Sequence, residues 1–183
     1  MGLAGALLAD LVDTGEVTIQ QGRVASRRRK DAPLDPLVAR LAAPLRGETT
    51  AHPVRDWLRF LAEGADRQVA DHLQRLGWIT PVPSRLGLRP ARVHLVRGEH
   101  HRADVQLARI SARLPDRDRL PTEDVVIAGL LRATGLASSI VADLDRAAAT
   151  EHLDRLLDAL DPPRRACVAA TAAAVGEATL RHP

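Results

Sequence analysis

The sequence predicts a mainly α-helical protein, a single helical-bundle domain over residues 1–183 with one or two short β-hairpins. Apolar residues recur every three or four positions along most of the chain, which is the spacing of amphipathic helices. Only two short stretches alternate between apolar and polar residues as strands do. A chain of 183 residues that is 45% hydrophobic fits one soluble domain, which buries roughly 70% of its unfolded surface.

The chain is expected to begin with a buried helix and a hairpin. Leucines spaced three and four apart run from residue 2 to Asp13, and Gly15 can take the left-handed conformation that ends a helix. Val17 and Ile19 then alternate with polar residues, and a glycine turn leads to Val24. This pattern predicts a small hairpin.

Two helices should follow the hairpin. Asp35 and Pro36 are typical of a helix start, and Pro44 should end or bend that helix. From Pro53 to about Leu76 the apolar residues form one stripe. The stripe predicts the longest helix of the chain and the main support of its core.

The second half is expected to contain a second hairpin and then helices only. Residues 78–79, 86–88 and 93–95 resemble short strands or an extended hairpin loop between prolines. Apolar stripes over residues 103–114, 126–131, 153–160 and 166–180 predict the remaining helices.

The sequence favours no enzyme, metal or cofactor. Lys30 is the only lysine, so a phosphate-binding P-loop cannot be present, and the motifs of α/β-hydrolases and Rossmann enzymes are absent. The adjacent His100 and His101 would point to different sides of a helix, which does not make a metal site. The lone Cys167 lies among alanines and is expected to be an inert core thiol.

The composition also bears on compartment and partners. No stretch is long and apolar enough to cross a bilayer and no export signal is visible, so we expect a cytoplasmic protein. The only aromatic residues are Trp57, Phe60 and Trp78, which disfavours stacking on nucleic-acid bases. The near-exclusive use of arginine over lysine is typical of a GC-rich bacterial genome.

Two basic features stand out from a net charge of only +3. The first is a run of positive residues, Arg27, Arg28, Arg29 and Lys30, with Arg23 just before it. At an anionic membrane surface each such charge contributes roughly 1 kcal/mol, and the same charges also suit the phosphates of a duplex. A solvated loop is the alternative interpretation.

The second basic feature is the segment from Ser84 to Arg92. Two leucines, Leu86 and Leu88, lie at the expected tip of the second hairpin, and Arg85, Arg89 and Arg92 flank them. At a bilayer interface leucines insert and guanidinium groups meet lipid phosphates. The alternative is a hairpin whose leucines pack back on the domain.

Three stretches of the chain together resemble the Golgi phosphoprotein 3 family. Residues 2–11 followed by Gly15 and a strand resemble its Gly-Leu-x-Gly helix, residues 56–79 and 86–88 its central helix and hairpin, and residues 121–136 its later Leu-Leu-x-Ala-x-Gly-Leu helix. These proteins are peripheral Golgi adaptors that bind phosphatidylinositol 4-phosphate, and they have actinobacterial relatives. The resemblance implies a mostly helical bundle with a protruding, membrane-facing hairpin.

The resemblance also implies where this chain departs from the family. The family's headgroup pocket uses a tryptophan in an N-terminal segment that we expect this chain to lack, and three arginines that fall on Ala4, Glu63 and Asp66. Carboxylates repel a phosphate, so specific binding through that pocket is not expected. The membrane-facing hairpin is the part of the site that carries over, with Leu86 and Leu88 at its tip.

The leading hypothesis is therefore a peripheral protein on the inner face of the membrane. It would bind an anionic phospholipid or phosphoinositide, with an adaptor role and a protein client as further expectations. One alternative is a winged-helix DNA-binding regulator, because a helix followed by Trp78-Ile79 and an arginine-rich hairpin resembles a recognition helix and its wing. Against it, Glu63, Asp66 and Asp71 lie on that helix, so no nucleic acid is expected. The other alternative is a protein-interaction module without lipid binding.

Overall fold

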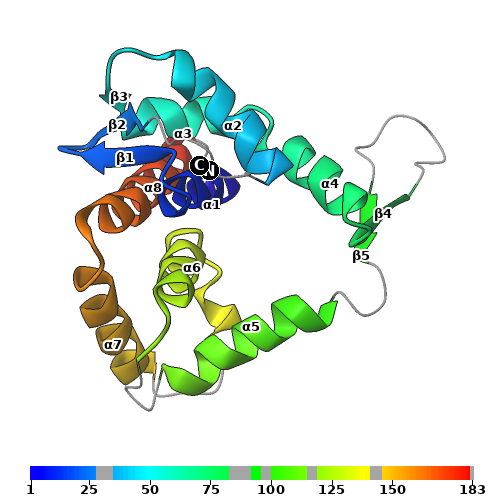
Figure 1. Ribbon diagram of the computed structural model, residues 1–183. Coiled ribbons are helices and arrows are strands. Elements are labelled where there is room, and N and C mark those ends of the chain that lie inside the picture. The colour runs from blue at the N-terminus through cyan, green and yellow to red at the C-terminus, as the bar shows by residue number, and fades with distance from the viewer. Residues whose placement is uncertain (28–34, 83–91, 96–99, 115–118, 141–145, 182–183) are drawn as a thin grey trace.

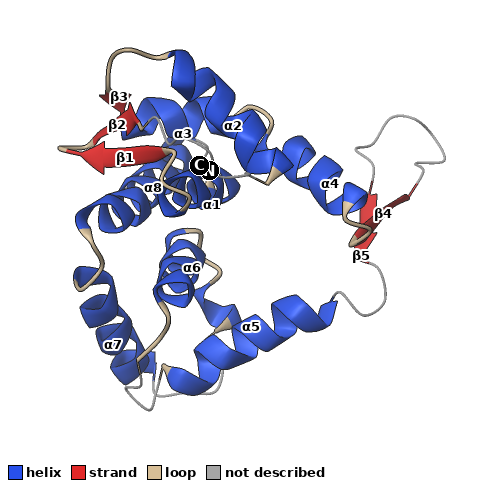
Figure 2. Ribbon diagram, in the orientation of Figure 1, coloured by secondary structure: helices blue, strands red, loops and turns tan. Residues whose placement is uncertain are grey.

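The computed structural model describes residues 1–27, 35–82, 92–95, 100–114, 119–140 and 146–181 (Figures 1 and 2). Helices dominate, as predicted, and the strands are few and short. The helices are α1 (Gly2–Asp13), α2 (Pro36–Gly47), α3 (Val54–Ala62), α4 (Ala65–Arg75), α5 (His100–Arg113), α6 (Thr122–Ala133), η1 (Ala137–Ser139), α7 (Arg146–Asp158) and α8 (Pro162–Arg181). The strands are β1 (Val17–Gln20), β2 (Arg23–Ser26), β3 (His52–Pro53), β4 (Ile79–Val82) and β5 (Arg92–Leu95).

Helix α1 lies at the centre of the fold. It packs against α2, α3, α4, α6, α8 and β1, and Leu8 and Leu11 are fully buried. Its start and end are those predicted, because Thr14 closes the helix and Gly15 has a φ of 74°. A helix that is apolar on most sides is stable only when other elements cover it, which explains its place in the core.

Two glycines allow the central helices to approach one another closely. A Cβ atom on Gly5 of α1 would lie 2.5 Å from Thr171 Oγ1 of α8. A Cβ atom on Gly129 of α6 would lie 2.8 Å from Leu157 Cδ2 and 2.9 Å from Val168 Cγ1. The contact surfaces of α1, α6 and α8 therefore depend on small residues at these positions.

The first hairpin is confirmed and gains a third strand. Strands β1 and β2 are antiparallel and are joined by Gln21 and Gly22, both with positive φ, as the tight hairpin turn requires. Strand β3 pairs with β2, with Val24 opposite His52. Buried Glu16 ties this sheet to α2, because Arg46 donates from Nε and Nη2 to its Oε2 atom, at 3.0 and 2.7 Å.

The long helix predicted over residues 53–76 is wrong as a single element. The chain leaves the helical conformation at Glu63 and Gly64, which separate α3 from α4. Glycine costs about 1 kcal/mol more than alanine inside a helix, so the break falls at the weakest position. Helix α3 supports the core with Trp57 and Leu58, whereas Ala65 is the one residue of α4 that is buried.

Pro44 was expected either to end or to bend its helix, and it does not end it. Helix α2 continues past it to Gly47, and Asp35 caps its start by accepting a hydrogen bond from the backbone nitrogen of Leu37 at 2.7 Å. Leu41 and Leu45 are buried on either side of the proline, so packing on the core holds this face together.

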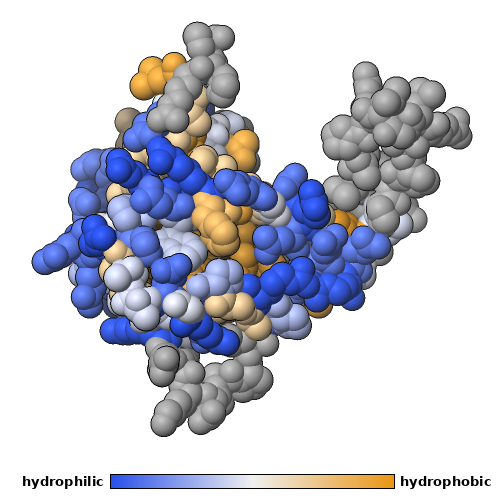
Figure 3. All heavy atoms as spheres, turned by 90° about the horizontal axis from the view of Figure 1, so that it is seen from above, coloured by the Kyte–Doolittle hydropathy of each residue, from blue (hydrophilic) through white to orange (hydrophobic). Residues whose placement is uncertain are grey.

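The C-terminal half is helical, as predicted. Helix α5 is linked to α6 by Arg109, whose Nη2 atom donates to Oδ1 of the fully buried Asp124 at 2.6 Å. Cys167 of α8 is buried, as expected, and burial raises the pKa of its thiol to about 12. No helix in the described ranges is long and apolar enough to cross a membrane. Seen from above, much of the surface is hydrophilic, and hydrophobic residues gather near its centre (Figure 3).

Candidate functional site

The second hairpin forms from β4 and β5 at the outer end of α4, away from the central helices (Figure 1). The strands are antiparallel, with Ile79 opposite Leu95 and Val82 opposite Arg92. Outside the pair itself, β4 packs mainly against α4. The hairpin was predicted correctly, although Leu86 to Leu88, also suggested as a strand, lie outside the described residues.

The residues proposed for the hairpin tip are only partly placed. Arg92 is the first residue of β5. The other four residues, Arg85, Leu86, Leu88 and Arg89, belong to residues 83–91, which lie outside the described residues. In the sequence this segment connects Val82 of β4 to Arg92 of β5, and these two residues pair with each other.

The basic run is likewise placed at one end only. Arg27 follows β2, is exposed, and its backbone nitrogen donates to the Glu16 carbonyl at 2.8 Å. Arg28, Arg29 and Lys30 lie outside the described residues. Arg23, which precedes the run, is held by the Ala51 carbonyl, to which its Nε and Nη2 atoms donate at 3.0 and 2.6 Å.

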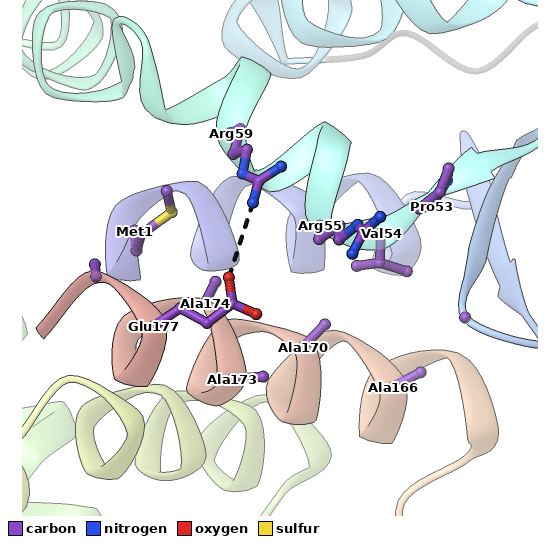
Figure 4. A pocket seen from close by; sticks show the side chains of 12 residues that line it. Met1, Pro53, Val54, Arg55, Arg59, Ala166, Ala170, Ala173, Ala174 and Glu177 are labelled. Atoms are coloured by element: carbon purple, nitrogen blue, oxygen red, sulfur yellow. Dashed lines mark ion pairs between the residues drawn. The ribbon is translucent and has the colours of Figure 1, made fainter. Parts of the chain in front are cut away.

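A groove with a basic wall lies between α3 and α8 (Figure 4). It has a volume of about 290 Å³, and alanines spaced three and four apart along α8 form its floor, from Ala166 to Ala178. Arg55 and Arg59 rise from α3 on the opposite side, and Glu177 of α8 faces Arg59.

The charges of this groove are loosely paired. Asp56 Oδ1 lies 3.6 Å from both Arg55 Nε and Arg59 Nη1, and Arg59 Nη2 lies 3.8 Å from Glu177 Oε2. These separations exceed the 2.7–2.9 Å typical of charge-assisted hydrogen bonds. Both guanidinium groups therefore retain donor capacity for an anion that lies over the apolar floor.

The whole-chain comparison decides the family. Residues 1–178 match the model of the family described as Golgi phosphoprotein 3 (GPP34). The chain belongs to the Golgi phosphoprotein 3 family. No curated protein matches the sequence significantly. Membership supports an adaptor role of the Golgi phosphoprotein type, in a family of non-enzymatic adaptor and lipid-binding proteins.

The three positions that the sequence resemblance assigned to the family's headgroup pocket, Ala4, Glu63 and Asp66, carry no positive charge. Ala4 of α1 is completely buried, and Glu63 and Asp66 are exposed on either side of the break between α3 and α4. The nearest arginine before them on α3 is Arg59, one helical turn earlier. The described arginines of α3, Arg55 and Arg59, thus both line the groove against α8.

The groove was missed in the sequence. Arg55 and Arg59 are four residues apart and so share one face of a helix, which is a visible signal. Their partner surface, the alanines of α8, is more than a hundred residues away in the sequence. Only the tertiary packing of α3 on α8 brings the two together.

Proposed function

We propose that this Golgi phosphoprotein 3 family member is a peripheral membrane protein that binds anionic lipid through the β4–β5 hairpin. The observation that carries the proposal is the attachment of this hairpin, which packs mainly on α4 at the edge of the fold. An element placed there can meet a flat membrane before the rest of the molecule does. We also propose that residues 1–183 form one domain without catalytic activity, at the cytoplasmic inner face of the membrane.

The chemistry of the segment joining β4 to β5 supports this role. Leu86 and Leu88 provide the apolar contact, while Arg85, Arg89 and Arg92 provide contacts to lipid phosphates. Arg27 to Lys30 form an auxiliary patch of the same sign. Binding energy of this kind grows with apolar insertion and with the negative charge of the surface.

The proposal includes the headgroup preference. Because Ala4, Glu63 and Asp66 offer no cation, we expect the protein to respond to membrane charge rather than to one phosphoinositide. Vesicles with phosphatidylinositol and vesicles with phosphatidylinositol 4-phosphate should bind it equally once their surface charge is matched. A preference for the phosphorylated lipid at matched charge would instead indicate a headgroup pocket rebuilt from other residues.

The test is co-sedimentation with neutral vesicles and with the two charge-matched anionic vesicles, at low and moderate salt. We expect binding to both anionic vesicles, weakened by salt, and its loss in the double variant Leu86→Asp and Leu88→Asp. Leu180→Asp is the matched control, because Leu180 is an exposed leucine at the end of α8, 84% accessible. Unchanged binding of the double variant would remove the hairpin from the mechanism.

The same preparations separate the two alternatives. Salt-sensitive binding to random duplex DNA, without binding to vesicles, would favour the winged-helix regulator. Binding to neither vesicles nor DNA would leave a protein-interaction module, with an adaptor role that needs no lipid.

A further inference from the structure

A second cavity, of opposite charge, opens between α1, α2, α4 and α6. We call it the acidic cavity, and its volume is about 590 Å³. Its walls are mostly aliphatic and include Leu3, Leu7, Leu37, Val38, Val69, Leu73, Val126, Ile127 and Leu130. Its ionisable lining residues are Asp10 and Asp13 of α1, Asp35 before α2, His72 of α4 and Glu123 of α6.

The carboxylates of the acidic cavity are only partly neutralised. Asp13 Oδ1 accepts a hydrogen bond from Arg164 Nε at 2.6 Å, and His72 Nε2 lies 3.7 Å from Asp35 Oδ2. Among the described residues, Asp10 has no ion-pair partner within 4 Å, and no arginine or lysine lines the cavity. Within the described part of the chain, the lining therefore carries more negative charge than its neighbours offset.

The behaviour of Asp10 reflects this excess charge. Partial burial and the nearby charges of Asp13 and Asp35 raise the pKa of Asp10 from 3.8 to about 6. Asp10 and Asp13 also occupy the last turn of α1, which has no basic residue, so both face the negative end of the helix dipole. A cation bound in the cavity would relieve this repulsion.

We propose that the acidic cavity binds an aliphatic polyamine. Its ammonium groups would meet the carboxylates on the different helices, and its methylene stems would lie against the leucine and valine walls. The volume falls within the 300–1,000 Å³ typical of small-molecule sites, which are mostly apolar with a few convergent polar groups. The proposal does not depend on lipid binding.

Other classes of ligand fit the cavity less well. A divalent metal ion needs several oxygen ligands around one point, and the described residues contain no group of three or more side chains that could hold one. An anion would be repelled by four carboxylates. An uncharged apolar molecule would contact the aliphatic walls but would leave the negative charge of the carboxylates uncompensated.

The test is isothermal titration calorimetry of the intact protein with spermidine at neutral pH. We expect saturable binding at one site. Two further probes separate the contributions, because 1,8-octanediol has an apolar stem without charge and Mg²⁺ has charge without a stem. Neither should displace spermidine at matched ionic strength. If Mg²⁺ displaced spermidine at concentrations similar to that of spermidine itself, the cavity would be a non-specific acidic surface, and the proposal would be overturned.

Two variants address the cavity from different sides. Glu123→Gln removes a charge, and Ala6→Leu fills part of the cavity from the exposed face of α1 without changing charge. We expect each to weaken spermidine binding about tenfold, the loss expected for one charge-assisted contact or an equivalent steric block. Asp71→Asn is the matched control, since Asp71 is an exposed carboxylate of α4 that does not line the cavity. Far-UV circular dichroism verifies folding, and equal affinity in all variants would contradict the proposed site.

Discussion

Replacing Gly5 by alanine should destabilise the protein, although alanine is the better helix former. Gly5 lies in α1, where it faces α8 and α6. A Cβ atom at this position would lie 2.5 Å from Thr171 Oγ1, 2.7 Å from Thr171 Cγ2 and 3.0 Å from Leu130 Cδ2. Thr171 cannot turn away freely, because it is fully buried and its hydroxyl donates to the Cys167 carbonyl at 2.9 Å.

The expected magnitude follows from two opposing contributions. Glycine to alanine in a helix interior gains about 1 kcal/mol, whereas forcing an extra carbon into a packed core costs about 1–3 kcal/mol and more when the neighbours cannot move. Here the neighbours are Thr171 and Leu130, both buried. We expect a net loss of about 1–2 kcal/mol, which corresponds to a melting temperature lower by roughly 2–8 °C for a chain of this size.

The assay is thermal and urea unfolding followed by circular dichroism. Gly176→Ala is the matched control, because Gly176 lies in α8 with no atom within 4 Å of the added carbon, and this variant should be more stable than the parent. Adding Thr171→Ala to Gly5→Ala should recover part of the loss, as a double-mutant cycle would show. A Gly5→Ala variant as stable as Gly176→Ala would refute the close packing of α1 on α8.

Three further predictions concern buried and charged groups. Because the pKa of Asp10 is raised to about 6 in the fold, its ionised form opposes folding, so Asp10→Asn should increase the free energy of unfolding above about pH 6. Because the Asp10 side chain is only partly shielded from solvent, water screens part of this effect, and the gain is about 1 kcal/mol. It should vanish below about pH 4 in urea titrations across pH. Arg109→Ala should lower the melting temperature, because it leaves the buried Asp124 carboxylate without its cation, whereas the exposed Arg113→Ala should not. The thiol of Cys167 should react with a maleimide only after unfolding, since it is buried with a pKa of about 12.

The helices were predictable because their apolar spacing is local information. The start of α2 at Asp35 and the end of α1 before Gly15 were also predictable, since caps depend on one or two residue types. The break at Gly64 was not predicted, because the apolar stripe continues across it. What decides the break is that α3 packs into the core while α4 extends towards the β4–β5 hairpin, and no local pattern contains that information.

The candidate sites also differ in how far the sequence alone could predict them. The basic hairpin segment is contiguous in sequence, so its chemistry could be recognised before its position was known. The groove and the acidic cavity each combine residues from distant elements, such as Arg59 with Glu177 and Asp10 with Glu123. Their sequence signals are single charges on helix faces, which are typical of any solvated helix.

The motif shared with the Golgi phosphoprotein 3 family can be explained by packing alone. In residues 2–5, a Cβ atom on Gly2 would meet Thr134 Cγ2 at 2.3 Å, and one on Gly5 would meet Thr171. Both glycines are thus required by the contacts of α1 with its neighbours. Ala4, where the sequence resemblance led us to expect the family's arginine, is fully buried. Gly2 and Gly5 thus serve the packing of the helices, whereas Ala4, Glu63 and Asp66 offer no cation. Family membership therefore fits a conserved type of scaffold, and our proposal places lipid binding on the β4–β5 hairpin rather than on these positions.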